Sequence, residues 1–148
     1  MHNPANYFEQ EHARIGVLLH AHLLDLIGAD FAGALQHFQR WQQALKHHID
    51  IENTQLLPHI PARARWPARM YLLEHERIML LADEYLLKLR HIAQHPPIDT
   101  TGQRQAILDL LDAIHALRHL LEHHHQREEI ALANELPPEL QQAVWGSG

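Results

Sequence analysis

The chain has 148 residues, of which 46% are hydrophobic, and this is enough for one domain with a substantial core. A net charge of −6 argues against a broad surface for nucleic acid or an anionic membrane. The absence of cysteine excludes disulfides, thiolate metal sites and a cysteine nucleophile. No apolar run reaches the ~20 residues of a membrane span, and no signal peptide pattern is present. We therefore expect a soluble cytoplasmic protein.

The first two predicted helices have clear start and stop signals. Asn3-Pro4 is typical of an N-cap followed by proline at the first helical position. An apolar stripe continues from there until Gly28. Asp30 is a candidate N-cap for a second helix, whose stripe continues until about Pro58.

The second half of the chain repeats this pattern of long helix and short break. A loop bounded by prolines leads to a third helix that begins near Pro67. The break HPPIDT offers Asp99 or Thr100 as the cap of a fourth helix, which we expect over about 101–134. The segment ELPPELQQAVW then predicts a breaker and a short terminal helix.

These elements predict an all-α fold, because alternating strand patterns are absent and helical periodicity is strong in all four segments. Long helices joined mostly by short loops favour an up-down-up-down antiparallel four-helix bundle. We expect residues 1–135 to form this bundle and residues 136–148 to form a C-terminal tail. We find no sequence repeat beyond that pattern.

The second and fourth helices share an anomaly near their C-terminal ends. The apolar seam of each changes to a histidine and then, four residues later, a glutamate: His48 with Glu52, and His124 with Glu128. A core position does not hold a glutamate unless something compensates its charge. The chain also has 16 histidines, and histidine is the commonest metal ligand.

Counting along the helices predicts that four histidines lie at one depth. His12 and His75 lie 8 residues after the prolines that begin their helices. His48 and His124 lie about equally far before the ends of theirs. With a rise of 1.5 Å per residue, antiparallel packing places all four in one layer within ~3 Å along the axis.

This layer predicts a dinuclear metal centre. Two histidines per metal, both glutamates as bridges and a solvent-derived oxide or hydroxide would leave one open position on each ion. Histidine and carboxylate ligation suits iron or manganese, with zinc as a further option. The predicted ligands are His12, His48, Glu52, His75, His124 and Glu128.

The choice of register within the histidine runs leaves one alternative open. His47 is rotated ~100° from His48 and is expected off the seam. His125 with Glu129 has the same spacing as His124 with Glu128 and could replace it. Among the other histidines, His22 is expected in the core or in contact with a ligand residue, but not as a ligand itself. The surface or an interface is expected for His20, His47, His91, His95, His115, His119 and His123.

Four motif regions, EHARI, HHIDIENTQLLP, LEHERI and HHHQREEIAL, resemble those of the hemerythrin-like (HHE cation-binding) domain, and the resemblance extends to about residue 135. It implies a non-heme di-iron centre with the four histidines as terminal ligands and Glu52 and Glu128 as bridges. Oxygen-carrying hemerythrins usually have a second histidine where this chain has Met79, and an aspartate in the fourth helix. The set is more similar to the di-iron domain of bacterial iron–sulfur cluster repair proteins, whose usual cysteine-containing N-terminal domain is not in this sequence.

The favoured hypothesis is a di-iron protein that binds or senses O2, NO or peroxide, or handles iron in stress response, with a protein redox partner as a further expectation. One alternative is a metal-stabilised binding or signalling module, with zinc in place of iron. A weaker alternative is a di-iron oxidase or peroxidase with Tyr71 as a relay. We assign no enzymatic activity, because the sequence shows neither a substrate pocket nor a separate acid–base pair. It does not give the oligomeric state.

Overall fold

The computed structural model describes the backbone of residues 5–146 and the side chains of residues 7–146, and it contains no strand in this range. The prediction of an all-α chain is confirmed there. The predicted start at Asn3-Pro4 lies outside the described residues. The long helices are α1 (Ala5–Ile27), α2 (Phe31–Ile51), α3 (Ala68–Gln94) and α4 (Thr100–Arg127).

Local signals set several of these boundaries. α1 ends one residue before Gly28, and the side chain of Asp30 caps α2 by accepting a hydrogen bond from the backbone N–H of Gly33. α3 begins directly after Pro67. Asp99 is the N-cap residue of α4, but its side chain makes no capping hydrogen bond.

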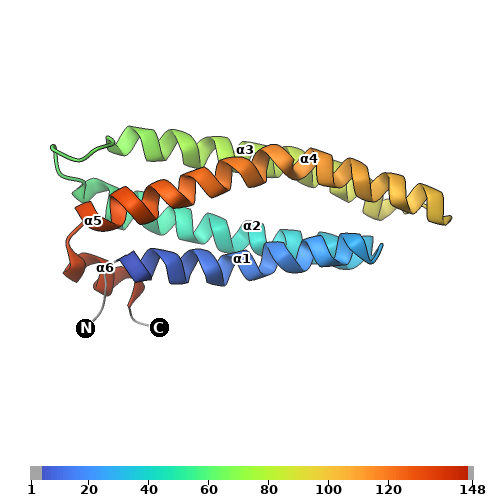
Figure 1. Cartoon of the computed structure of the whole chain (residues 1–148), viewed down its shortest axis with the longest axis horizontal. Helices are drawn as coiled ribbons and strands as arrows, with labels where there is room; N and C mark the ends of the chain where they lie inside the picture. Colours follow the sequence, from blue (N-terminus) through green and yellow to red (C-terminus); the bar gives the residue numbers. More distant parts are fainter. Residues whose placement is uncertain (1–4, 147–148) are drawn as a thin grey trace.

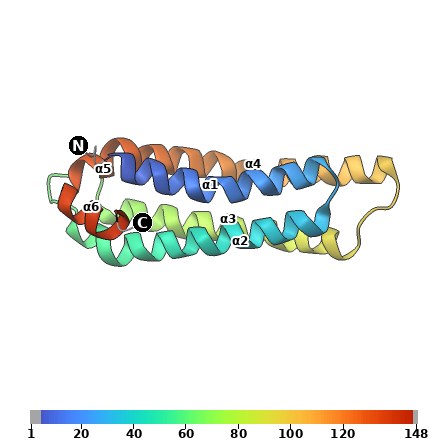
Figure 2. The same cartoon turned by 90° about the horizontal axis from the view of Figure 1, so that it is seen from below.

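The four long helices lie side by side along the long axis of the molecule (Figures 1 and 2). The short helices α5 (Ala133–Glu135) and α6 (Pro138–Trp145) gather at the end where α1 begins and α2 ends (Figure 1). Among the described residues, no helix is both long and apolar enough to cross a membrane.

The second and fourth helices are not α-helical to their ends, which differs from the prediction. A π-helical segment, η1 (Glu52–Leu56), follows α2 and continues into a 3₁₀ turn, η2 (Leu57–His59). A second π-helical segment, η3 (Glu128–Leu132), follows α4 and leads into α5. Each π segment therefore begins at a glutamate of the predicted metal site.

These π turns change which residues face the core. The N–H of Leu57 bonds to the carbonyl of Glu52, and the N–H of Ala133 bonds to the carbonyl of Glu128, so each bond spans five residues instead of four. The extra residue brings Leu57 and Ala133 to the buried face, and both are at most 3% exposed. An α-helical count of 3.6 residues per turn does not predict this.

The apolar core consists of two clusters. The larger one fills the middle of the molecule, around Phe38, Trp41 and Leu110. The smaller one lies at the end that carries α5 and α6, around Phe8, Leu56 and Tyr71. The predicted metal-site residues lie between the two clusters, as the next section describes.

His22 is fully buried in the larger cluster, as the sequence predicted for it. Its Nδ1 donates to the carbonyl of Ala34 at 2.7 Å, which leaves Nε2 to accept from the Tyr85 hydroxyl at 2.6 Å. Burial lowers the pKa of His22 from its usual value near 6.5, so the folded protein holds this imidazole neutral. The histidine thus joins α1, α2 and α3 through a satisfied polar network.

This burial predicts a pH-dependent contribution to stability. Below about pH 6.5 the unfolded chain binds a proton at His22 that the folded chain does not, so the free energy of unfolding falls as the pH drops, by up to ~1.4 kcal/mol per pH unit. Urea unfolding of metal-free protein at pH 7.5 and 5.5 should show a smaller pH effect in His22→Gln than in wild type. His91→Gln, which changes an exposed histidine, should keep the wild-type effect. Equal pH effects in all three proteins would contradict the prediction.

Candidate metal centre

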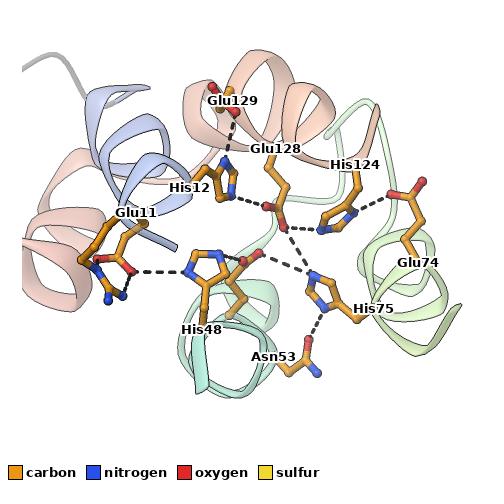
Figure 3. Close-up of polar contacts among 11 residues, drawn as sticks. Glu11, His12, His48, Asn53, Glu74, His75, His124, Glu128 and Glu129 are labelled. Carbon is orange, nitrogen blue, oxygen red and sulfur yellow. Dashed lines mark hydrogen bonds and ion pairs between the residues drawn. The ribbon is translucent and has the colours of Figure 1, made fainter. Parts of the chain in front are cut away.

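The structure brings the six predicted ligands into one buried cluster. Figure 3 labels the four histidines and Glu128 between the long helices. Glu52 and Glu128 have no exposed surface, and His48, His75 and His124 are each 2% exposed. His12 is 8% exposed. Each histidine comes from a different long helix, and each glutamate begins a π segment. This group could hold a metal ion, because its ligand atoms form two sets that each lie within 4.8 Å of one another.

The carboxylate of Glu128 reaches across the cluster. Its Oε1 is 2.9 Å from Nε2 of His12. Its Oε2 is 3.0 Å from Nε2 of His124 and 3.4 Å from Nε2 of His75. The two oxygens of one carboxylate therefore face histidines on opposite sides of the cluster (Figure 3).

Glu52 makes the corresponding contacts from α2. Its Oε1 is in close contact with Nε2 of His48, and its Oε2 is 3.7 Å from Nε2 of His75. Each glutamate thus has one oxygen on the side of His12 and His48 and the other on the side of His75 and His124. The cluster is divided into two histidine pairs with both carboxylates between them.

The outer nitrogens of two histidines are held by hydrogen bonds. Nδ1 of His12 is 3.0 Å from Oε2 of Glu129, and Nδ1 of His75 is 2.7 Å from Oδ1 of Asn53. In both cases the acceptor follows a cluster glutamate in the sequence. It also lies on a different helix from the histidine that it contacts.

The other two histidines have acceptors as well. Nδ1 of His124 is 2.9 Å from Oε1 of Glu74, and Nδ1 of His48 is 3.5 Å from Oε2 of Glu11. These four acceptors form a closed cycle (Figure 3): α1 supplies the acceptor for α2, η1 for α3, α3 for α4, and η3 for α1. We call this set the outer acceptors: Glu11, Asn53, Glu74 and Glu129.

The outer acceptors determine which ring nitrogen of each cluster histidine is free to bind a metal ion. A carboxylate or an amide oxygen can only accept, so Nδ1 of His12, His75 and His124 carries a proton. The carboxylate of Glu11, at 3.5 Å, favours the same tautomer in His48. A neutral imidazole then directs the lone pair of Nε2 at the carboxylate oxygens, with no proton between them. Lone pairs and carboxylates facing one another in a buried space repel unless a cation lies among them. The donor set therefore fits a metal.

Without a metal ion, the cluster residues can balance their charges only by binding protons. This shifts the pKa values of the histidines and glutamates. Burial opposes charging of His48 and His124, but the nearby glutamates raise the pKa of each to about 10. Burial and the charge of Glu128 raise the pKa of Glu52. Burial also opposes ionisation of Glu128, but its histidine neighbours, led by His124, lower its pKa well below the usual range.

Apolar layers cover the cluster on both sides along the helix axes. One turn towards the middle, each long helix contributes one aliphatic residue: Ile15, Leu45, Ile78 and Leu121. Towards the other end lie Phe8, Leu56, Tyr71 and Leu132. Excluding water in this way strengthens every electrostatic interaction within the cluster.

The C-terminal segment completes the cover. The ring of Trp145 in α6 stacks on His48, with centroids 4.7 Å apart and planes within 13°, and it also meets the edge of Phe8. The buried Gln141 donates to the carbonyls of Ala133 and Leu136, which anchors α6 to the preceding turn. α6, which lies in the segment expected as a C-terminal tail, thus contacts the cluster directly through Trp145.

The two alternatives in the histidine runs have different places in the structure. His47 is exposed, and His125 lies outside the two ligand sets. The ring of His125 stacks on His12 at 3.8 Å, and its pKa is lowered to about 2 by burial and by the neighbouring histidines. Glu129 holds His12 from outside. His124 with Glu128 is therefore the pair that points into the cluster.

Sequence reasoning did not identify the outer acceptors, although a signal was present. Glu11 and Glu74 directly precede His12 and His75, so the same Glu-His pair occurs in both odd-numbered long helices. Asn53 and Glu129 directly follow the cluster glutamates. Adjacent helical residues point ~100° apart, and only the packing shows that each acceptor meets a neighbouring helix.

Tyr71, considered above as a relay, is part of the apolar cover of the cluster. Its side chain is fully buried, and its hydroxyl has no hydrogen-bond partner among the residues that the structure describes. Its ring belongs to the apolar cover at the α5–α6 end.

Comparisons of the chain with protein-family models, with curated proteins and with solved structures found no match. The arrangement of side chains is therefore the evidence on function.

The outer acceptors predict an effect on metal affinity without loss of a ligand. Glu74→Ala removes the acceptor that orients His124, and we expect a 10–100-fold weaker metal affinity, measured by competition with a chelator. Arg127→Ala removes the ion pair between Arg127 and Glu74 but leaves the His124 hydrogen bond, so its loss should be much smaller. Glu76→Ala, at an exposed position of the same helix, should bind metal as wild type does. Equal losses in all three variants would contradict an orienting role for Glu74.

Proposed function

We propose that the cluster is a dinuclear metal centre, with iron as the metal, and that the protein binds or senses a small ligand such as O2, NO or peroxide. One observation carries the proposal: four imidazole Nε2 atoms and two fully buried carboxylates divide into two histidine pairs bridged by both glutamates. Histidine with carboxylate, without any thiolate, is a donor set that suits iron.

We further propose that α1 to α4 form an up-down-up-down bundle within a domain over residues 1–135, of the hemerythrin-like kind that the sequence motifs resemble. The side-by-side arrangement of the long helices supports this. So does the placement of one histidine from each helix at the same depth. Bundles of this type build metal sites from facing helices in their cores.

The residues of the chain have distinct tasks in this proposal. When bound, two iron ions supply open coordination positions and reversible electron transfer. Glu52 and Glu128 balance the cationic charge and fix the separation of the two halves. The outer acceptors hold the Nδ1 protons and aim each Nε2 inward. The apolar layers exclude bulk water, so only a small ligand reaches the centre.

Metal analysis tests the proposal directly. Protein purified from iron-supplemented cells should contain two iron ions per chain by mass spectrometry. It should show near-ultraviolet absorption that dithionite bleaches and that returns in air, because iron in this donor set can cycle between two oxidation states. A colourless protein that carries zinc and is unchanged by dithionite would instead support a metal-stabilised binding module.

A paired substitution tests the ligand assignment. Glu52→Ala removes one bridge and should reduce the bound metal to half or less, whereas His47→Ala changes an exposed neighbour and should leave the metal content at two per chain. Circular dichroism of both variants shows whether the helices are retained. Equal metal losses from the two variants would rule out the assignment of Glu52.

A further inference from the structure

A groove between α1 and α4 leads from the surface to the cluster. It is a cavity of about 450 Å³, bounded on the α1 side by Ile15, Gly16 and Leu19, with Trp41 also in its wall. The remaining wall belongs mainly to α4. Five of the lining residues are of types that bind metals: His12, His115, His119, Glu122 and His125. Among these, His12 is itself a member of the cluster.

The α4 residues form a sequence of closely spaced donors. Residues three or four apart lie on the same face of a helix. The steps from His115 to His119, to Glu122 and to His125 therefore advance by about 6, 4.5 and 4.5 Å along the axis. The last step ends beside His12, on which His125 stacks at 3.8 Å. Imidazole and carboxylate groups thus extend continuously from solvent to the first ligand.

The groove also meets the cluster where it is least covered. Of the six cluster residues, His12 is 8% exposed and the others are at most 2% exposed. The apolar layers and Trp145 cover the cluster in other directions. A hydrated ion cannot cross these apolar layers without a large desolvation cost. The side of His12 is therefore the favourable approach for a cation.

We propose that this groove is the route by which divalent metal ions enter the cluster, and that His115 and His119 are the residues that first bind the incoming ion. The inference depends on the proposed function, because it assigns an entry route to that metal centre. His115 and His119 are both exposed, with ring centroids 6.2 Å apart. Glu122 and His125 receive the ion next and pass it to His12.

Arg118 lies at the same groove and carries a positive charge. Its side chain is exposed, so the guanidinium can stay in water away from the path. Its charge nevertheless slows the approach of a cation and would speed the approach of an anion. The sign of its effect therefore distinguishes a cation route from a pocket for an anionic ligand.

Metal uptake by the full-length, metal-stripped protein tests the route. Cobalt(II) is mixed with the protein in a stopped-flow instrument, the visible absorption of the bound ion gives the rate, and mass spectrometry after desalting gives the final content. His115→Gln with His119→Gln should slow uptake five-fold or more and leave the final content unchanged. His91→Gln with His95→Gln is the matched control, because these exposed histidines at the C-terminal end of α3 have the same sequence spacing, with ring centroids 5.2 Å apart. That control should take up cobalt at the wild-type rate.

Two further variants keep the test independent of the histidines. No atom lies within 4 Å of a Cβ built at Gly16, so Gly16→Leu places a side chain into the groove while improving helix propensity. It should slow uptake several-fold. Arg118→Glu should increase the uptake rate at least two-fold at low salt.

The outcomes separate this inference from the function on which it depends. A wild-type protein that binds no cobalt at the cluster would overturn the proposed metal centre itself. Normal final content with unchanged rates in the double-histidine and Gly16→Leu variants would overturn the route alone. A slower rate in Arg118→Glu would overturn a cation path. A lower final content in the double-histidine variant would mean that these residues are ligands and not part of a route.

Discussion

The structure depends on the placement of two carboxylates, those of Glu52 and Glu128, in a core from which water is excluded. Each is fully buried, and burying an uncompensated carboxylate costs several kcal/mol. Outer acceptors accept hydrogen bonds from Nδ1 of three of the imidazoles around them, and Glu11 lies 3.5 Å from Nδ1 of His48. Each Nε2 is therefore left to face the carboxylates, where it can bind a proton or a metal ion. A cation between these groups satisfies both sets of charges, and the arrangement is unfavourable without one.

The outer acceptors also connect the helices to one another. Each acceptor lies next to a cluster residue of its own helix and contacts the histidine of the next, so the cycle includes all four long helices. The first and second halves of the chain use matching positions: Glu11 with Glu74, His12 with His75, and Asn53 with Glu129. The site therefore has an approximate two-fold character. The sequence indicates it only in part, since Asn53 and Glu129 differ in type and their partners lie on other helices.

Much of the site could be predicted from the sequence, because the relevant signals are local. A seam that changes from leucine to His48 and Glu52 is visible in a periodic pattern, and residue counts give the depth of His12 in its helix. Other features depend on tertiary contacts. The π turns after Ile51 and Arg127 have no recognised local signal. The stacking of Trp145 on His48 requires that α6 fold back over the end of the long helices.

The two π turns have a consequence for how this chain is aligned with others. Each is equivalent to one inserted residue, so the positions after Glu52 and Glu128 are out of phase with an uninterrupted helix by about 100°. An alignment without a gap at these points would pair Leu57 or Ala133, both buried here, with residues that face solvent. Deleting a single residue in either turn would restore regular α-helical bonding and keep the downstream apolar side chains on the core face. Regular α-helical bonding without such a deletion would rotate those side chains out of the core.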